Sequence, residues 1–298
     1  MGILIKQDLN FLENPLWLQN LEQNSRGLVW KDKDGYIYKT MGKAPTKTDA
    51  IFLYYLLQCS QKNNWNNKLE LTYYEIIKGS DIQPNSWWYN RLQDSLERWA
   101  WLKIGFKGSF YKNKKRYSTI FGVIDSFELP KYKGEKLKIT LSEKWLYEIK
   151  ISEYYKLIDF EEMKSLKTPL ATRLYEILSK TFKGRNEWSI DAHKLANKIP
   201  MQEQYLSDIV AKVNPAINRI NKKTTLNIGL EIRKKERGKA VLVFRLINKQ
   251  IETKLEKKKL DFSTGGIIEW ANSPDNRTKT TGKTTQEIIA MMKRENIS

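Results

Sequence analysis

The sequence contains very little cysteine and histidine, with one residue of each among 298. The single cysteine, Cys59, permits no disulfide within the chain, which is typical of proteins from a reducing compartment. Cys59 lies in an apolar helical pattern, where a buried structural thiol is expected. The single histidine, His193, leaves a zinc site, a Ser-His-Asp triad or a paired-histidine metal site without the groups it needs. Most hydrolytic chemistry is therefore excluded, and we expect no metal and no cofactor.

Long hydrophobic runs and phosphate-binding loops are also missing. The longest apolar run, Ile51 to Leu57, is far too short to span a bilayer, which takes about 20 residues. No apolar segment typical of an export signal follows Met1, so we expect no membrane association and predict a cytoplasmic protein. Gly282-Lys283-Thr284 resembles the end of a phosphate-binding loop, but Arg277 occupies the position of the required first glycine. These patterns favour a protein that is not an enzyme.

Positive charge is the most prominent feature that is present. Lys and Arg total 53 against 34 Asp and Glu, which gives a formal net charge of +19. Such an excess favours a polyanionic partner, although the codons of an AT-rich gene, which favour Lys, Asn and Ile, are an alternative origin. Hydrophobic residues make up 40% and aromatic residues 12% of the chain, as in a globular protein. The length fits two domains and a short tail.

Hydrophobic spacing predicts a series of elements in the first half of the chain. Residues 48–60 have the pattern of a core-facing helix, and Leu69 to Leu71 alternate like a strand. Thr72 can cap a short helix that Gly79 ends. Asn85 or Ser86 can cap a longer helix to about Trp99, on which one face is apolar and the other carries Arg91, Asp94, Ser95 and Arg98. Two strands, 101–107 and 116–127, flank a basic turn.

The second half repeats this order. Residues 165–182 form a helical stripe that ends at Gly184, and 187–190 alternate like a short strand. Asp191 can cap a helix that Pro200 stops. A longer helix over 204–221 contains Pro215, which either kinks it or restarts it. Two strands follow on the two sides of a second basic turn, 233–239.

Helix, strand, helix, helix and hairpin is the order of a winged-helix domain. In that fold the third helix can enter the major groove of DNA while the hairpin reaches phosphates or the minor groove. We therefore predict an α+β protein of two tandem winged-helix domains with a flexible C-terminal tail. The expected segments are an N-terminal arm (1–40), a first domain (41–135), a second domain (136–253), and a linker and tail with a short helix (254–298).

Residues expected to contact DNA fall into two groups. Base contacts are expected from polar residues judged to be exposed on the two third helices: Asn85, Ser86, Arg91, Ser95 and Arg98 in the first domain, and Gln204, Ser207, Lys212 and Arg219 in the second. Phosphate contacts are expected from the two basic turns: Lys112, Lys114, Lys115 and Arg116 in the first, and Arg233, Lys234, Lys235, Arg237 and Lys239 in the second. A polar helix face or a basic hairpin tip can also be merely solvated, which is the alternative for each residue.

The second half also contains motifs of a known family. They are Pro169-Leu170-Ala171, the run Arg173-Leu174-Tyr175-Glu176-Ile177-Leu178-Ser179, Ile199-Pro200, Pro215-Ala216-Ile217, Ile220-Asn221 and Thr224. In this order and spacing they resemble the replication initiator protein A group of plasmid initiators, over roughly residues 130 to 250. The first half is similar to that family in its element order more than in its residues.

The resemblance implies a protein that binds repeats of double-stranded DNA in a plasmid replication origin, mainly through the second winged helix. It also implies DNA melting, recruitment of the host initiator and replicative helicase, a homodimer that represses the initiator's own gene and so controls copy number, and association with the nucleoid or plasmid. Two alternatives remain open. One is a dimeric winged-helix transcriptional regulator without replication activity; the other is an enzyme such as a primase or recombinase.

Overall fold

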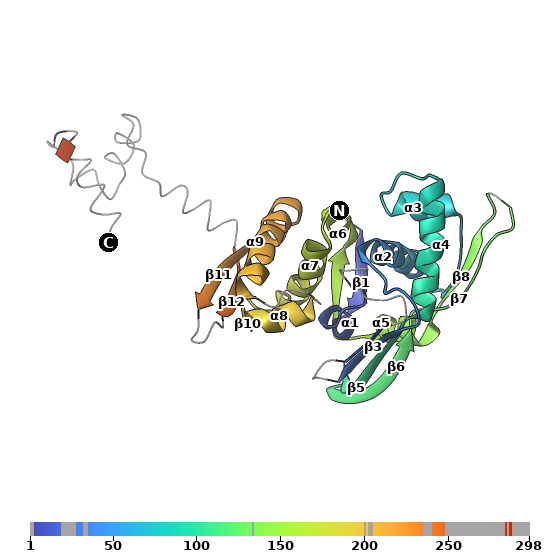
Figure 1. Ribbon diagram of the computed structural model, residues 1–298, viewed down its shortest axis with the longest axis horizontal. Coiled ribbons are helices and arrows are strands. Elements are labelled where there is room, and N and C mark those ends of the chain that lie inside the picture. Colours follow the sequence, from blue (N-terminus) through green and yellow to red (C-terminus); the bar gives the residue numbers. More distant parts are fainter. Residues whose placement is uncertain are drawn as a thin grey trace. The chain divides into compact units, whose positions relative to one another are not determined.

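The computed structural model describes residues 3–18, 28–31, 35–132, 134–199, 201, 205–234, 240–247, 284 and 286–287, with the backbone alone for 28–31 and 234. Met1–Leu246 form one compact unit and Ile247–Ser298 a second. All the helices and strands named below belong to the first unit (Figure 1). Most of the tail, with nearly all of the helix predicted there, lies outside the described residues.

The series of elements predicted for the first half is present. Its members are α2 (Lys47–Lys62), β4 (Lys68–Leu71), α3 (Tyr73–Gly79), α4 (Ser86–Trp101), β5 (Lys103–Lys112) and β6 (Lys115–Gly122). Thr72 caps α3 as predicted, because its hydroxyl accepts a hydrogen bond from the Glu75 amide. Gly79 has to be a glycine, since a Cβ there would lie 2.0 Å from the Tyr55 ring of α2.

The second half contains the same series. Its members are α7 (Pro169–Thr181), β10 (Glu187–Asp191), α8 (Ala192–Lys198), α9 (Leu206–Lys223), β11 (Ile228–Lys234) and β12 (Ala240–Leu246). Pro215 lies inside α9, which continues through it without restarting. The helix predicted from residue 165 instead begins at Pro169, because proline favours the first helical position and disfavours helix in the residue before it.

Strand pairing identifies the hairpins that are equivalent in the two halves of the chain. In the second half β10 pairs with β12, and β12 pairs with β11, giving the order β10-β12-β11. In the first half β4 pairs with β8 (Leu137–Leu141), and β8 pairs with β7 (Ile124–Glu128), giving the order β4-β8-β7. The strand between the first two helices therefore pairs with the second strand of a hairpin in both halves, and in the first half that hairpin is β7–β8.

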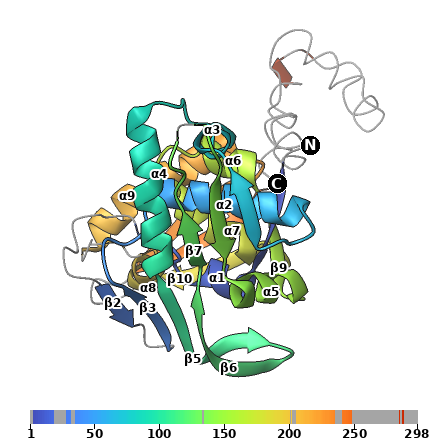
Figure 2. The same ribbon diagram turned by 90° about the vertical axis from the view of Figure 1, so that its right-hand side faces the viewer.

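The prediction of a single strand over 116–127 is wrong. This segment is divided at Val123 into β6 and β7, which belong to different sheets. The β5–β6 hairpin joins β2 (Leu28–Lys31) and β3 (Tyr36–Thr40) in a four-stranded sheet of order β2-β3-β5-β6. Figure 2 shows this hairpin at the end of α4 opposite α3. Its basic turn is therefore not the counterpart of the turn between β11 and β12.

The segment expected to be an N-terminal arm contributes residues to the core, including Ile5, Phe11 and Tyr36. Strand β1 (Leu4–Asp8) pairs with β9 (Tyr155–Asp159), and α1 (Leu9–Glu13) follows it directly. Phe11 of α1 packs edge-on against Phe121, with ring centroids 5.4 Å apart, and is 1% exposed. Burial of Phe11 and Phe121 contributes to the stability of this half.

Two further helices and a shared polar cluster complete the unit. The helices are α5 (Glu143–Ile151) and α6 (Phe160–Ser165). The buried carboxylate of Glu176 on α7 accepts hydrogen bonds from Tyr54 of α2, at 3.0 Å, and from Arg173, at 2.8 Å.

A domain boundary at residue 135 would separate β8 from β4 and β7, between which it lies, so strand pairing favours a boundary after β8.

Candidate nucleic-acid interface

Helix α4 is held by one buried stripe. Asn85 caps it, with its side-chain oxygen accepting from the Trp88 amide at 3.0 Å. Leu92, Ser95, Leu96 and Trp99 are buried, and their spacing of three, one and three residues places them on one face. The Trp99 indole donates to the backbone carbonyl of Asp49 on α2, at 2.9 Å, which fixes the rotation of α4 against α2.

Two arginines of α4 converge on one buried carboxylate. Asp49 is 0% exposed; Arg91 Nη1 lies 2.6 Å from its Oδ1, and Arg98 Nη1 lies 3.1 Å from its Oδ2. Burial alone would raise the pKa of Asp49, but hydrogen bonds from Arg91 and the charges of both arginines hold this pKa below its ordinary value. Both arginine side chains are mostly buried, at 13% and 12% exposure.

This arrangement corrects the predicted exposed face of α4. Ser95 is 0% exposed and so lies on the core side, because it is three residues from Leu92 and four from Trp99. Arg91 and Arg98 point toward α2 and are bound to Asp49. A contact between any of these three side chains and DNA would require a rearrangement, so they are structural in this conformation. Asn85 and Ser86 are exposed, as predicted.

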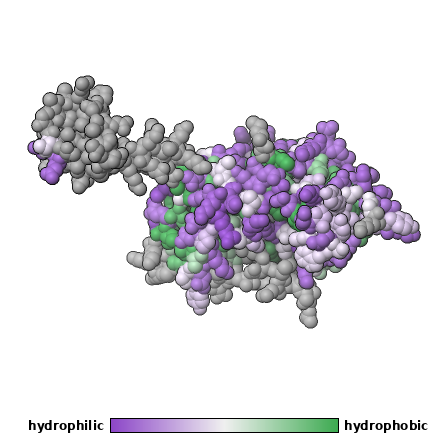
Figure 3. All heavy atoms as spheres, turned by 90° about the horizontal axis from the view of Figure 1, so that it is seen from above, coloured by the Kyte–Doolittle hydropathy of each residue, from purple (hydrophilic) through white to green (hydrophobic). Residues whose placement is uncertain are grey.

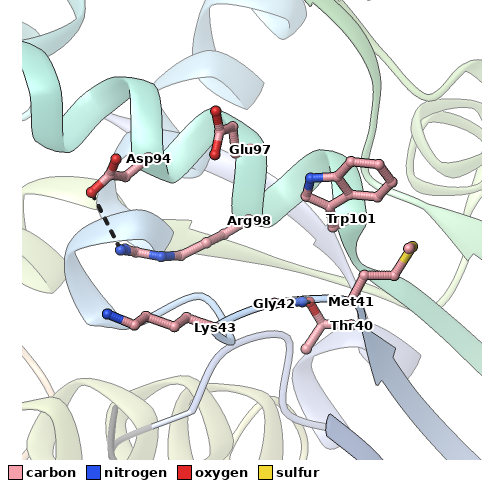
Figure 4. Close-up of a pocket in the computed structure, with 8 residues that line it drawn as sticks. All are labelled: Thr40, Met41, Gly42, Lys43, Asp94, Glu97, Arg98 and Trp101. Atoms are coloured by element: carbon pink, nitrogen blue, oxygen red, sulfur yellow. Dashed lines mark hydrogen bonds and ion pairs between the residues drawn. The ribbon is translucent and has the colours of Figure 1, made fainter. Parts of the chain in front are cut away.

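The outer face of α4 carries exposed residues that were not among the predicted DNA contacts. Its exposed residues from Ser86 on include Trp87, Asn90, Asp94, Glu97 and Trp101. Figure 4 shows part of this face, with Asp94 beside Arg98 and with Trp101 at the end of the helix next to Met41. The face has two carboxylates and no exposed Lys or Arg. A spacing of three to four residues from Trp87 would have identified it.

The outer face of α9 has the opposite charge. Its exposed ionisable residues are four cations and one carboxylate: Lys212, Arg219, Lys222, Lys223 and Asp208. Ser207 is exposed too, and its hydroxyl donates to Asp208 at 3.2 Å. The other side of the helix is buried through Ile209, Val213 and Ile220. Gln204, a predicted base contact, lies outside the described residues.

The β5–β6 hairpin is bound to α1 and α5 near its tip. The Asn10 side chain donates to the Tyr111 carbonyl and accepts from the Tyr111 amide, both at 2.9 Å. Lys112 forms an ion pair with Glu148 of α5 at 2.8 Å, so its charge is already compensated. Lys114, Lys115 and Arg116 are exposed. Asn113 and Lys114, with φ of 50° and 60°, make the two-residue turn.

The hairpin that pairs with β4, β7–β8, was not among the predicted DNA-contacting elements. Between β7 and β8 it presents Lys131, Tyr132 and Lys136, all exposed. The Lys131 ammonium lies 5.4 Å from the centre of the Tyr132 ring. Alternation over 137–141 could have revealed β8, but only strand pairing distinguishes this hairpin from β5–β6 as the equivalent of β11–β12.

Carboxylates line the sheet beside the second basic turn. Glu231 bonds Arg233 at 2.7 Å and Arg245 at 2.6 Å, and Arg245 also bonds Glu187 at 2.7 Å. Hydrogen bonds from Arg233 and Arg245 lower the pKa of Glu231 to about 2. For Lys234 only the backbone is described, and Lys235, Arg237 and Lys239 lie outside the described residues.

The described part of the chain holds neither a metal-binding cluster nor a membrane-spanning helix. No set of three or more His, Cys, Asp or Glu side chains there is arranged to hold a metal ion. Within the same residues, no helix has the length and apolar character needed to cross a bilayer. Hydrophilic residues cover most of the described surface on the face in Figure 3, and hydrophobic residues form separate areas.

The fold is shared with solved structures of very different sequence. A selenomethionine derivative of domains 2 and 3 of RctB matches with a TM-score of 0.52 and 12% identity, covering 77% of this chain and 94% of that one. A second structure of RctB domains 2–3 matches with a TM-score of 0.50 and 14% identity, covering 80% and 97%. No curated protein has a significant sequence match.

These features define a mixed α/β protein with two copies of one helix–strand–helix–helix–hairpin series, in a fold that is also found in RctB. The sequence model of the family described as Replication initiator protein A matches residues 6–206. The match covers more than half of the chain. The chain therefore belongs to the replication initiator protein A family, and this membership supports a role in plasmid replication initiation.

Proposed function

We propose that this protein initiates plasmid replication by binding repeated double-stranded sites in an origin through two winged-helix units, without catalysing a reaction itself. The first winged-helix unit extends from α2 through β8 and the second winged-helix unit from α7 through β12, and both lie within the compact unit Met1–Leu246. The observation that carries the proposal is the basic outer face of α9, the third helix of the second unit. A helix at this place in a winged-helix unit can enter the major groove.

The two winged-helix units carry their exposed cations on different elements. Lys212 and Arg219 lie seven residues apart on α9, about two helical turns, so both can face the same groove. Exposed Lys131 and Lys136 on the β7–β8 hairpin are positioned as phosphate contacts of the first unit. Among the earlier candidates, Asn85, Ser86, Ser207, Lys212 and Arg219 stay as base contacts. The phosphate contacts that we still propose are Lys114, Lys115, Arg116, Arg233, Lys234, Lys235, Arg237 and Lys239. Gln204, which lies outside the described residues, stays a proposed base contact.

Footprinting on the DNA that flanks the protein's own gene tests the proposal, combined with mobility shifts over a salt series. We expect several regularly spaced protected repeats beside an AT-rich stretch. If six to ten cations contact phosphates, the logarithm of affinity falls with the logarithm of salt concentration at a slope of about −5 to −9. Lys212→Ala and Arg219→Ala should weaken binding, whereas Lys150→Ala on α5 is the matched control outside both units.

The alternative is a winged-helix regulator that binds one inverted repeat as a stable dimer. A single protected palindrome over a promoter would favour this alternative. Repression of the initiator's own gene by a homodimer and recruitment of the host initiator and helicase are expectations from the family. So is a cytoplasmic location on the plasmid. Each needs its own test, beginning with the oligomeric state on and off DNA.

A further inference from the structure

A second charged region lies away from the outer face of α9. A pocket of about 650 Å³ opens where α1, the end of α7, β10 and α8 meet. Figures 1 and 2 both show α1 near α8 at the base of α7. Its lining includes five charged residues and one tryptophan: Glu13, Lys180, Lys183, Arg185, Lys198 and Trp188. Its volume is in the range of ordinary small-molecule sites.

The lining has more positive charge than its own carboxylate can balance. Glu13 forms ion pairs with Lys180 and with Lys198. Lys183 turns its ammonium to the Tyr155 carbonyl, at 2.7 Å, and Arg185 is exposed at the rim. The lining thus contains four cations and one carboxylate, so a bound anion would reduce repulsion among the cations.

The repulsion acts on Lys180. Burial, together with the charges of Lys198 and Arg185, lowers the pKa of Lys180 to about 8. An anion in the pocket favours the charged form of this amine and so raises its pKa again. Binding of an anion near pH 8 should therefore be accompanied by proton uptake.

One wall of the pocket is aromatic and apolar. Trp188 is half-buried and stacks on Phe244, with ring centroids 5.5 Å apart and planes at 24°. Leu9 and Ile190 also line the pocket. A flat ring can stack on such a wall, as bases stack on aromatic side chains in other nucleic-acid-binding proteins. Bare phosphate would make no use of this wall.

We propose that this pocket binds a nucleoside polyphosphate, with its phosphates held by Lys180, Lys198 and Arg185 and its base against Trp188. The chain has no phosphate-binding loop, so binding rests on side chains alone. The site goes beyond the proposed DNA-binding function and does not depend on it. Its occupant is a small molecule whose binding can be measured without any DNA.

Fluorescence anisotropy of a fluorophore-labelled ADP, with the full chain, tests the proposal. Unlabelled ADP and ATP should compete. Pyrophosphate and adenosine should each compete at least about tenfold more weakly, because each lacks one half of the interaction. Arg185→Gln and Lys198→Gln should each weaken ADP binding about tenfold. Lys194→Gln, on the exposed side of the same helix α8, should leave it unchanged.

Calorimetry of ADP binding near pH 8, in buffers of different ionisation enthalpy, should show net proton uptake in the wild type. Arg185 is exposed, so its variant should fold normally, as thermal unfolding would verify. Absence of labelled-ADP binding by the wild type overturns the proposal. Equal competition by pyrophosphate and ADP also overturns it, because the pocket would then be a bare anion site. Loss of DNA affinity in Arg185→Gln without any ADP binding would make the pocket part of the DNA interface.

Discussion

The third helices of the two repeated series, α4 and α9, occupy the same place in the order of elements but present opposite charges. On α4 the two arginines turn inward to Asp49, and the outer face carries Asp94 and Glu97. On α9 the buried side is apolar, so its cations remain outside. The number of arginines and lysines on a helix therefore does not by itself give its capacity to bind DNA, since both arginines of α4 are bound to Asp49. A buried carboxylate decides which way a cation points.

The largest expected effect comes from removing that carboxylate. Asp49→Ala leaves Arg91 and Arg98 without their shared partner, and loss of one member of a buried ion pair costs about 3–5 kcal/mol of the free energy of unfolding. Urea denaturation measures it. Asp94→Ala is the control, because this exposed carboxylate lies 3.6 Å from Arg98 and should cost less than about 1 kcal/mol. Equal small losses would mean that both arginines are available to DNA.

Charge reversal tests the other half of the comparison. Lys212→Glu or Arg219→Glu on α9 should reduce affinity for origin DNA by about 1–3 kcal/mol and make the salt slope about one unit shallower. Mobility shifts over a salt series give both quantities. Asp94→Lys, the converse change on the outer face of α4, should leave affinity nearly unchanged. If it strengthened binding as much as the α9 changes weakened it, α4 would lie as close to DNA as α9.

The two hairpins of the first half differ in a similar way. Lys131→Ala and Lys136→Ala on β7–β8 should each weaken binding to all sequences by up to about 1 kcal/mol and lower the salt slope, because these residues lie on the hairpin paired with β4. Lys114→Ala and Lys115→Ala on β5–β6 should have smaller effects. The reverse ranking in mobility shifts would restore β5–β6 as the DNA-contacting hairpin.

The smallest effect concerns the carboxylate beside the second turn. Glu231→Gln should strengthen DNA binding slightly, because Arg233 and Arg245 would no longer be neutralised by it. In the wild type the folded-state pKa of Glu231, about 2, lies below the ordinary 4.5. Its contribution to stability is therefore present above about pH 4.5 and is lost as the pH falls toward 2. An NMR titration of the carboxyl carbon that gave a pKa near 4.5 would contradict these contacts.

Local patterns in the sequence account for the individual elements and their repeated order. Apolar spacing and caps located α2, α3, α4, α7, α8 and α9, because a helix buries one stripe and its ends need polar partners. The motifs around Arg173 and Pro215 led to the family whose sequence model matches residues 6–206. These signals are short in range, and each can be read from neighbouring residues.

Contacts between distant segments, by contrast, set which elements lie together. The pairing of β4 with β8, the place of β1 beside β9, and the inward turn of Arg91 and Arg98 all join residues more than 40 positions apart. Ser95 has a polar side chain but is buried in the core. An arginine or a basic turn looks the same in sequence whether it faces solvent or a carboxylate. The physical reason is that burial and charge compensation belong to contacts between distant segments, which local patterns do not encode.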